Sequence, residues 1–529
     1  MTPAAQPIWT PSPERARNAA LTRFSHYVHE RYKAPVHDYA SLHRWSVEFP
    51  ENFWNAVWDF CEIRCSQNAQ QTIEDGARMP GAQWFVGALL NYAENLIPVG
   101  DDSIAIVFRN EAGERRELTR HQLRTEVARV ADGLKQSGVK VGDRVAGYLP
   151  NIPEAVIAML AATSLGAIWS SCSPDLGASA VVDRFGRIQP RVLFAADGYR
   201  YAGKHIDCLP SVAEVCEGVS SIERVVLVPY LNTDVEPDRI SHGVLFEQFG
   251  DPDQPLTFAQ LPFEQPAFIV YSTDTTGAPT CIVHSAGGAL IQQKKENILH
   301  SDMGAEDRCL YFTTCGWGMW NALASGLAAG ATIVLFDGAA LQPEPNILWR
   351  IVAEERVTIF GTGPEYLASC ERQGLRPREQ FDLSALRTVI STGTLPPACY
   401  RYVYREVHPD IHLSTISACT DIMACFGIGC PTLPVYEGEI QALGLGMNVA
   451  VFDGAGKPLL GQRGELVCTH PFPSLPVGLW GDAQADRLVA TYFSRYPNVW
   501  CHGDLATLTS RGSLIVHERA EVPEAELSA

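Results

Sequence analysis

The sequence predicts an α/β protein with two helix-covered, mainly parallel sheets and a β-rich, barrel-like subdomain toward its C-terminal end. From Gly142 onward, short β-branched runs alternate with longer helical patterns, which is typical of parallel strands joined by helices. After about Cys430 the pattern changes to short strands separated by turn signals. A chain of 529 residues is also long enough for two or three packed subdomains.

The elements follow from local patterns. Arg144–Tyr148 predicts a strand, Pro153–Ser164 a helix and residues 167–170 the next strand. Pro396 predicts the first turn of a helix that ends near Glu406. Further strands are predicted at 191–195, 223–228, 267–271, 331–336, 357–360 and 387–391. That number of strands exceeds one small sheet.

The remaining segments are predicted from turn and strand signals. Residues 231–262, rich in Asp, Pro and Gln, predict a surface excursion between the two sheet halves. In the C-terminal region, residues 437–442, 447–452 and 465–469 predict short strands, with Asp453-Gly454 as a turn.

Composition excludes several function classes. A formal charge of −19 and a pI near 5.2, without a Lys/Arg-rich run, exclude nucleic acid as the main partner. The longest apolar run, residues 156–169, is too short for a bilayer, and the N-terminus lacks the pattern of a secretory signal. Fifteen cysteines without a CxxC pair predict reduced, mostly buried thiols rather than a zinc site. We therefore expect a cytoplasmic protein without membrane association.

The segment richest in chemistry is Ser-Thr-Asp-Thr-Thr-Gly-Ala-Pro-Thr at residues 272–280. It follows a predicted strand and precedes a helical pattern that begins after Gly288. Hydroxyls and backbone N–H groups between a strand and a helix are suited to holding phosphate oxygens. Taken alone, the segment predicts a plain surface turn equally well.

The sequence of this segment resembles the phosphate loop of the adenylate-forming enzymes. The next residues, Ile-Val-His-Ser-Ala-Gly-Gly at 282–288, resemble the acetoacetyl-CoA synthetase family in particular. Further segments that resemble that family are 42–48, 151–155, 171–175, 383–393, 431–436 and 438–441. These segments occur in the same order as in the family, and the resemblance extends from about Pro7 to Arg519. The resemblance implies that family's N-terminal domain, with two α/β subdomains in 1–430 and a β-rich subdomain in 431–519. It implies that residues 520–529 are a hinge or tail remnant and that the small C-terminal domain is absent.

The resemblance also implies roles for individual residues. Thr420 would bond the α-phosphate and Asp421 would reach Mg²⁺, which makes them the catalytic pair. Nucleotide contacts would come from Ser272, Thr275, Thr276, Gly277, Gly393, Thr394, Asp504 and Arg519. The substrate pocket would be lined by Trp317, Gly318, Ala322 and Ala418.

The sequence also departs from the family pattern. Thr280 stands at the position of the phosphate-loop lysine, and Asp274 at that of a glycine. A carboxylate about 4 Å from a phosphate charge would cost about 4 kcal/mol at an effective dielectric near 20, which disfavours the usual ATP pose. The lysine that the small C-terminal domain supplies for adenylation is also expected to be missing.

The pocket departs from the family as well. Trp317 and Trp320 are each predicted to be core anchors, since aromatic side chains are mostly buried. Gly318 and Ala322 are smaller than the family's residues at these positions. If Trp317 lines the pocket instead, these small neighbours predict an acyl group larger than acetoacetate.

Three functions follow as alternatives. The first is ATP- and Mg²⁺-dependent activation of a small carboxylic acid as an acyl-adenylate, with transfer to CoA or another nucleophile. Here a complementing protein or an acyl carrier would be a further partner. The second is a repurposed, ATP-independent biosynthetic enzyme that uses the acyl pocket, with His284, Cys315, Glu365 or Cys419 as acid, base or nucleophile. The third is a non-catalytic binding protein or truncated remnant.

Overall fold

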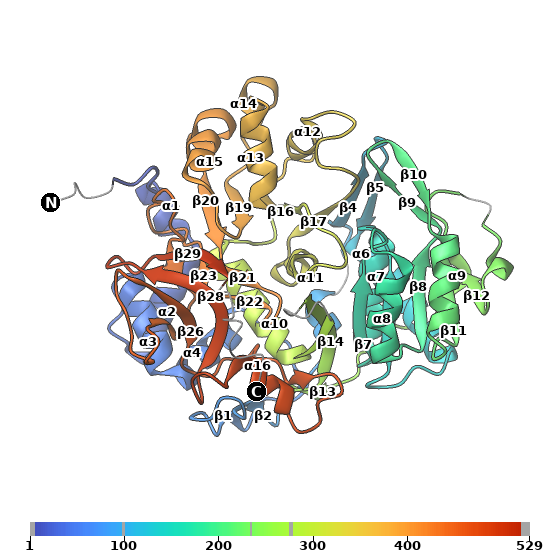
Figure 1. The fold of residues 1–529 in the computed structure, drawn as a ribbon, viewed down its shortest axis with the longest axis horizontal. Coiled ribbons are helices and arrows are strands. Elements are labelled where there is room, and N and C mark those ends of the chain that lie inside the picture. The colour runs from blue at the N-terminus through green and yellow to red at the C-terminus, as the bar shows by residue number, and fades with distance from the viewer. Residues whose placement is uncertain (1–5, 98–100, 233–234, 274–278, 520–529) are drawn as a thin grey trace.

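Two large sheets organise the chain (Figure 1). The computed structural model describes residues 6–97, 101–232, 235–273 and 279–519. An eight-stranded sheet and a seven-stranded sheet are both mainly parallel, and a smaller antiparallel sheet follows them in the chain. The predicted α/β class and the two sheets are therefore confirmed.

The eight-stranded sheet is parallel from β12 to β14, and its last two strands are antiparallel additions. In spatial order its strands are β12 (Gly243–Leu245), β11 (Arg224–Val228), β8 (Val192–Ala196), β6 (Arg144–Tyr148), β7 (Ile168–Cys172), β14 (Pro266–Thr273), β15 (Pro279–Ser285) and β27 (Gly478–Leu479). Its helices are α6 (Arg120–Gln136), α7 (Pro153–Ser164), α8 (Ala178–Ile188) and α9 (Leu209–Gly218).

The seven-stranded sheet is parallel except for β5 at its edge. Its order is β20 (His412–Ile416), β19 (Thr388–Thr392), β18 (Ile359–Thr362), β16 (Arg308–Tyr311), β17 (Thr332–Asp337), β4 (Ile104–Asn110) and β5 (Arg115–Thr119). The helices along this part of the chain are α11 (Gly318–Ser325), α12 (Ile347–Glu354), α13 (Pro364–Arg372), α14 (Pro377–Gln380) and α15 (Pro397–Tyr402), which η5 (Val403–Val407) continues.

Shorter elements surround these sheets. The N-terminal part holds α1 (Pro13–Asn18), α2 (Ala20–Tyr32), α3 (Tyr39–Glu48), α4 (Pro50–Phe60), β1 (Gln71–Glu74), β2 (Gln83–Val86), β3 (Leu89–Leu90) and α5 (Tyr92–Leu96). The middle holds β9 (Gly198–Tyr201), β10 (Lys204–Asp207), η1 (Pro237–Arg239), η2 (Phe246–Gln248), β13 (Leu261–Pro262) and η4 (Gly326–Ala329).

The C-terminal region is rich in β-structure, as predicted. Its main sheet is antiparallel, in the order β25 (Val449–Phe452), β26 (Arg463–Cys468), β28 (Trp500–Leu508) and β29 (Leu514–Arg519). Around it lie β21 (Ala418–Cys419), β22 (Ala424–Cys425), β23 (Gly427–Ile428), β24 (Ala442–Leu443) and α16 (Asp486–Tyr492).

Two local predictions need correction. The predicted excursion at 231–262 contains β12, which extends the eight-stranded sheet at its edge beside β11. The predicted strand at 437–442 is reduced to an isolated bridge at Ile440 and the two-residue β24. Both errors arise at short edge segments, where turn residues interrupt the strand pattern.

Helix α10 (Ala286–Lys295) lies at the centre of the molecule and continues into η3 (Glu296–His300) (Figure 1). All ten of its residues are buried. Lys295 Nζ donates to the Leu445 carbonyl at 3.0 Å and lies 3.6 Å from Glu296 Oε1, and Lys294 Nζ donates to the Glu62 carbonyl at 3.3 Å. Burial lowers the pKa of both lysines. The two buried ammonium groups of this helix are therefore paired with carbonyls from distant parts of the chain.

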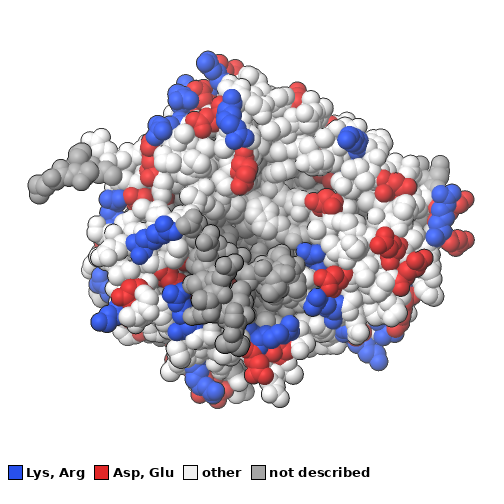
Figure 2. Space-filling model, viewed as in Figure 1, with Lys and Arg blue, Asp and Glu red and all other residues white. Residues whose placement is uncertain are grey.

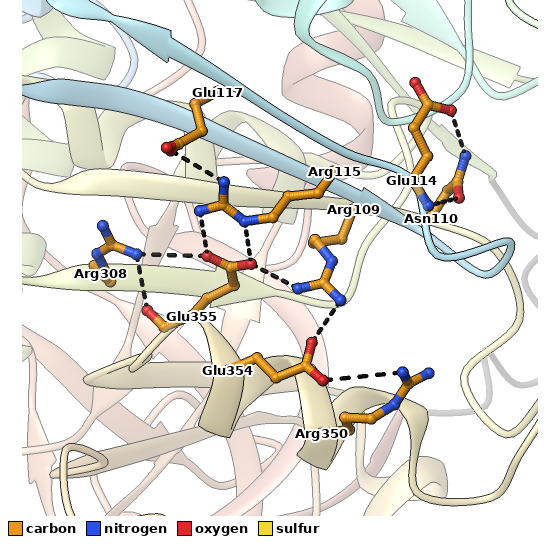
Figure 3. A network of polar contacts seen from close by, with 9 residues as sticks. All are labelled: Arg109, Asn110, Glu114, Arg115, Glu117, Arg308, Arg350, Glu354 and Glu355. Carbon is orange, nitrogen blue, oxygen red and sulfur yellow. Dashed lines mark hydrogen bonds and ion pairs between the residues drawn. The ribbon is translucent and has the colours of Figure 1, made fainter.

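A buried ion network joins the edge of the seven-stranded sheet to α12 (Figure 3). Glu355, only 2% exposed, accepts from Arg109 Nη1 at 2.6 Å and from Arg115 Nε at 2.8 Å. Arg308 Nη1 lies 3.5 Å from the same carboxylate and donates to the Glu355 carbonyl at 3.0 Å. Burial alone would raise the pKa of Glu355, but the bonds from Arg115 and Arg109 outweigh it and lower that pKa.

We expect Glu355→Gln to lower the free energy of unfolding by about 3 kcal/mol at pH 7, because it removes the buried anion that Arg109 and Arg115 share. Arg109 would keep only its pair with the more exposed Glu354. The folded-state pKa of Glu355 is depressed, so its contribution is present above the unfolded pKa near 4.3 and is lost as the pH falls through the folded value. Urea unfolding at pH 7 and pH 3.5 measures both effects.

The matched control is Glu344→Gln, which removes an ion pair with Arg350 whose two side chains are 47% and 37% exposed. Such a pair is worth about 1 kcal/mol or less. Equal losses in the two variants would contradict the structural role given to the buried network.

Candidate active site

Several predicted site residues lie where parallel strands of the seven-stranded sheet end, an edge at which α/β sheets commonly bind ligands. Gly393 follows β19 directly and has φ +71°, and its N–H donates to the Ile416 carbonyl at 3.0 Å at the end of β20. A Cβ added there would meet no atom within 4 Å, so the backbone faces open space. Thr394 Oγ1 donates to the Val516 carbonyl at 3.0 Å and links this edge to β29.

Thr420 and Asp421 occupy the turn of a tight hairpin between β21 and β22. Asp421 is 6% exposed, and its Oδ2 accepts from the Tyr492 hydroxyl at 2.9 Å. A Cβ placed on Gly318 would stand 3.0 Å from Thr420 Oγ1. The threonine hydroxyl therefore lies against the first residue of α11.

His284 on β15 holds this turn from behind. It is fully buried, and its Nε2 lies 3.2 Å from the Thr420 carbonyl. Burial lowers the pKa of His284 to about 4, so the ring is neutral near pH 7 and its Nε2–H donates to that carbonyl. His284 thus positions Thr420, a role that its predicted use as an acid or base did not anticipate.

Asp504 on β28 pairs in register with Arg519 on β29. The Asp504 Oδ2 atom lies 3.5 Å from His502 Nε2, and His502 Nδ1 accepts from Trp500 Nε1 at 3.2 Å. Because Nδ1 accepts, the neutral His502 ring carries its proton on Nε2, toward Asp504. The predicted nucleotide contacts Asp504 and Arg519 are therefore on adjacent strands, and the Arg519 side chain lies outside the described atoms.

The four residues predicted for the substrate pocket line one cavity of about 120 Å³, together with Thr420: Trp317, Gly318, Ala322 and Ala418. The prediction of Trp320 as a core anchor is confirmed, since it is fully buried and donates to Asn151 Oδ1 at 3.0 Å. The same prediction for Trp317 is wrong, because Trp317 is 37% exposed. Its ring meets the ring of Tyr311 in an edge-on contact. Trp317 precedes the first turn of α11, outside the packed face of that helix.

Sequence reasoning missed most of this cavity. The further lining residues come from α10, η3, β16, α11 and the strands after β19, and they include Gln293, Glu296, Asn297, Met303, Tyr311, Leu323, Met423 and Ile428. Their only sequence signal is helical spacing, as between Gln293 and Asn297, and that spacing predicts a buried face without saying what the face meets.

The hydroxyl-rich segment is arranged differently from the prediction. Ser272 on β14 pairs with Thr280 on β15 in an antiparallel hairpin. The segment therefore joins two strands, and the helix N-terminus comes only at Ala286. The predicted contacts Thr275, Thr276 and Gly277, like Asp274, lie outside the described residues.

The residues proposed for ATP-independent chemistry are not brought together. Burial raises the pKa of the Cys315 and Cys419 thiols well above the usual range, so both are protonated and poor nucleophiles. Cys315 Sγ donates to the Pro150 carbonyl at 3.2 Å, and Glu365 is exposed on the first turn of α13. Within the described parts of the chain, these two thiols, Glu365 and His284 form no hydrogen bond with one another.

Two searches of the described residues bear on metals and membranes. Within them, no three His, Cys, Asp or Glu side chains gather as metal ligands, and no helix has the length and apolar character needed to cross a bilayer. On the face shown in Figure 2, basic and acidic side chains are interspersed. A phosphate backbone laid across this face would meet carboxylates as well as cations.

Buried histidines predict a loss of stability on acidification. Burial lowers the pKa of His284 to about 4 and that of His300 and His412 to about 3. Because each folded-state pKa is below the unfolded value near 6.5, the contribution of each histidine is complete above that pH and declines as the pH falls. We expect about 2 kcal/mol of loss per histidine between pH 6.5 and pH 5.

Urea unfolding of His284→Gln across this pH range tests the sign. The difference in free energy of unfolding between wild type and the variant should shrink by about 2 kcal/mol on going from pH 7 to pH 5. For the exposed control His26→Gln, this difference should stay the same across the pH range. A gap that widens on acidification would refute the buried, neutral assignment.

Comparisons with known proteins agree with this geometry. The chain matches the family model described as AMP-binding enzyme over residues 99–475, and the model for the N-terminus of acetyl-coenzyme A synthetase over 39–96. It is 42% identical to the acetoacetyl-coenzyme A synthetase of Rhizobium meliloti, over 98% of this chain and 80% of that protein. With the acetoacetyl-CoA synthetase of Danio rerio it shares 43% identity, over 96% of this chain and 78% of that protein.

A solved structure extends the likeness to three dimensions. The acetoacetyl-CoA synthetase from Streptomyces lividans matches with a TM-score of 0.94 and 42% identity, over 97% of this chain and 80% of that one. The chain therefore belongs to the acetoacetyl-CoA synthetase family of AMP-binding enzymes.

Proposed function

We propose that this protein uses ATP to activate a small carboxylic acid as an acyl-adenylate and then transfers the acyl group to CoA. The observation that carries the proposal is that Thr420, in the turn that also holds Asp421, lies against Gly318 and lines a largely apolar cavity. A carboxylate beside Thr420, with its acyl group in the cavity, would lie close to a hydroxyl donor and an acidic side chain. Membership of the family supports this reading of the site.

Four residues of the site would contact the nucleotide. Thr420 Oγ1 donates to an α-phosphate oxygen, and Asp504 accepts from the ribose hydroxyls. Gly393 and Thr394 border the adenine.

An oxygen of the acid attacks the α-phosphorus, the bond to the bridging oxygen of pyrophosphate breaks, and pyrophosphate leaves. In the second step the CoA sulfur attacks the acyl carbon, and AMP departs with the bonding electron pair.

Asp421 fits a role in holding Mg²⁺. Its Oδ2 accepts from Tyr492, and in the described structure Oδ1 keeps its lone pairs free of hydrogen-bond donors. Mg²⁺ in nucleotide sites is usually bound through one or two carboxylates and the phosphate oxygens, so one protein carboxylate suffices. When bound, the ion would offset charge on the triphosphate. Tyr492 fixes the carboxylate while the other oxygen stays available.

The two alternatives lack comparable support. An ATP-independent reaction would need a nucleophile or base, whereas the two candidate thiols are buried and protonated and His284 is committed to the Thr420 carbonyl. A purely binding role leaves the close placement of Thr420, Asp421 and the cavity without a purpose.

We expect Asp421→Asn and Thr420→Val each to reduce Mg²⁺-dependent exchange of labelled pyrophosphate into ATP by about 10²- to 10³-fold. Removing one group that stabilises developing charge typically has this effect. Both substitutions nearly preserve side-chain volume, and the control Asp238→Asn changes an exposed carboxylate of η1. Exchange that survives Asp421→Asn, or that needs no Mg²⁺, would contradict the role of this turn.

A further inference from the structure

One face of α11 lines the cavity beside Thr420. Gly318, Ala322 and Ser325 all line it, and their spacing of four and then three residues places them on one face of the helix. At a rise of about 1.5 Å per residue, Ser325 lies about 10 Å along the helix from Gly318, the residue against Thr420. The small side chains on this face leave room in the cavity.

At one end of this line, Gly318 adjoins Thr420. Two turns along the helix, Ser325 Oγ accepts from Asn297 Nδ2 at 3.0 Å and donates to the Ala322 carbonyl at 2.7 Å, so the Ser325 hydroxyl is paired with protein groups. Glu296 also lines the cavity, and its Oε1 accepts from Gln292 Nε2 at 2.8 Å and from the Cys425 N–H at 3.1 Å. Most other lining residues are apolar, among them Met303, Cys309, Leu323, Ile390, Ile416, Met423 and Ile428.

Gln293 adds one polar group without a protein partner. It is 6% exposed and lines the cavity, four residues before Asn297 on the same helical segment. Its Oε1 accepts from the Tyr92 hydroxyl at 2.8 Å. Its Nε2 donates to no residue in the described structure, and it is not one of the unpaired atoms there that protein encloses completely. An acceptor on a bound ligand would satisfy it.

The volume limits the ligand. An apolar cavity of about 150 Å³ holds one benzene molecule, six carbon atoms. The cavity here measures about 120 Å³ and so takes about five carbons beyond a carboxyl group placed beside Thr420. A four-carbon acid spans about 4 Å and a six-carbon acid about 6 Å when extended. Only the longer chain reaches Ala322, one turn into the helix.

From these observations we infer that the acid is a chain of about six carbons, apolar along its middle, with a hydrogen-bond-accepting oxygen that Gln293 Nε2 binds. The inference rests on the proposed acid activation and specifies its substrate class. An acid of four carbons would leave the inner part of the cavity unfilled and lose the contacts of its apolar walls.

The test compares pyrophosphate exchange by the full chain with butanoate, acetoacetate, hexanoate, 5-oxohexanoate and decanoate. Each buried methylene is worth about fourfold in kcat/KM. Two more methylenes therefore favour hexanoate over butanoate by about 16-fold. We also expect 5-oxohexanoate to exceed hexanoate, and decanoate to fall below both. Acetoacetate preferred over the six-carbon acids would overturn the inference while leaving acid activation intact.

Two kinds of variant locate the effect. Ala322→Trp, and the milder Ala322→Leu, fill the middle of the cavity and should reduce kcat/KM for hexanoate at least tenfold more than for butanoate. Gln293→Leu should remove only the advantage of 5-oxohexanoate over hexanoate. The control Ala112→Trp adds the same bulk at an exposed alanine between β4 and β5 and should change no ratio. Equal losses for both chain lengths in the Ala322 variants would refute the assignment.

Direct binding separates this inference from the proposed reaction. If no acid supports exchange, acid activation fails, and calorimetric titration with hexanoate in the absence of ATP then decides the pocket assignment. Hexanoate binding that Ala322→Trp abolishes and Ala112→Trp retains would support the six-carbon pocket. Absence of hexanoate binding to the folded wild-type protein would overturn it.

Discussion

The burial of every residue from Cys281 on β15 to Lys295 at the end of α10 is the constraint on which the rest of the structure depends. Because polar groups in a dry interior must be paired, this segment draws partners from distant parts of the chain. His284 bonds the Thr420 carbonyl, Lys294 the Glu62 carbonyl and Lys295 the Leu445 carbonyl. This segment thereby holds together the chain after α4, the β21–β22 turn and the loop after β24. The position of Thr420 therefore depends on hydrogen bonds made in the core.

The same constraint separates structural cations from those available to a ligand. Lys294 and Lys295 follow the β14–β15 hairpin closely in sequence, yet their ammonium groups are committed to backbone carbonyls. Arg109 and Arg115 are likewise committed to Glu355. If Thr280 occupies the position of the phosphate-loop lysine, as the sequence resemblance implies, another group has to balance the charge of a bound triphosphate. Asp421 can take part in that balance only through a metal ion, since its own charge has the same sign as phosphate.

Sequence patterns predicted the parallel strands because each is a short β-branched run bounded by turns, as in Arg144–Tyr148. They failed on the Ser272–Thr280 hairpin, since one short strand between a polar loop and a helix has no periodicity long enough to separate it from either. Contacts between residues distant in sequence could not be predicted from local sequence patterns. Trp317 and Trp320 are three residues apart, and only packing shows that one lines a cavity while the other is buried. The partners Arg115 and Glu355 are separated by 240 residues.

Within the site, reaction chemistry and acid selectivity are assigned to different elements. The β21–β22 turn presents Thr420 and Asp421, while small residues of α11, such as Ala322, line the cavity proposed for the acyl chain. A substitution at Ala322 changes the space available to the chain without altering the turn, because one helical turn separates it from Gly318, the residue against Thr420. Chain-length preference can therefore change independently of the adenylation machinery, provided that the buried His284 continues to hold the turn.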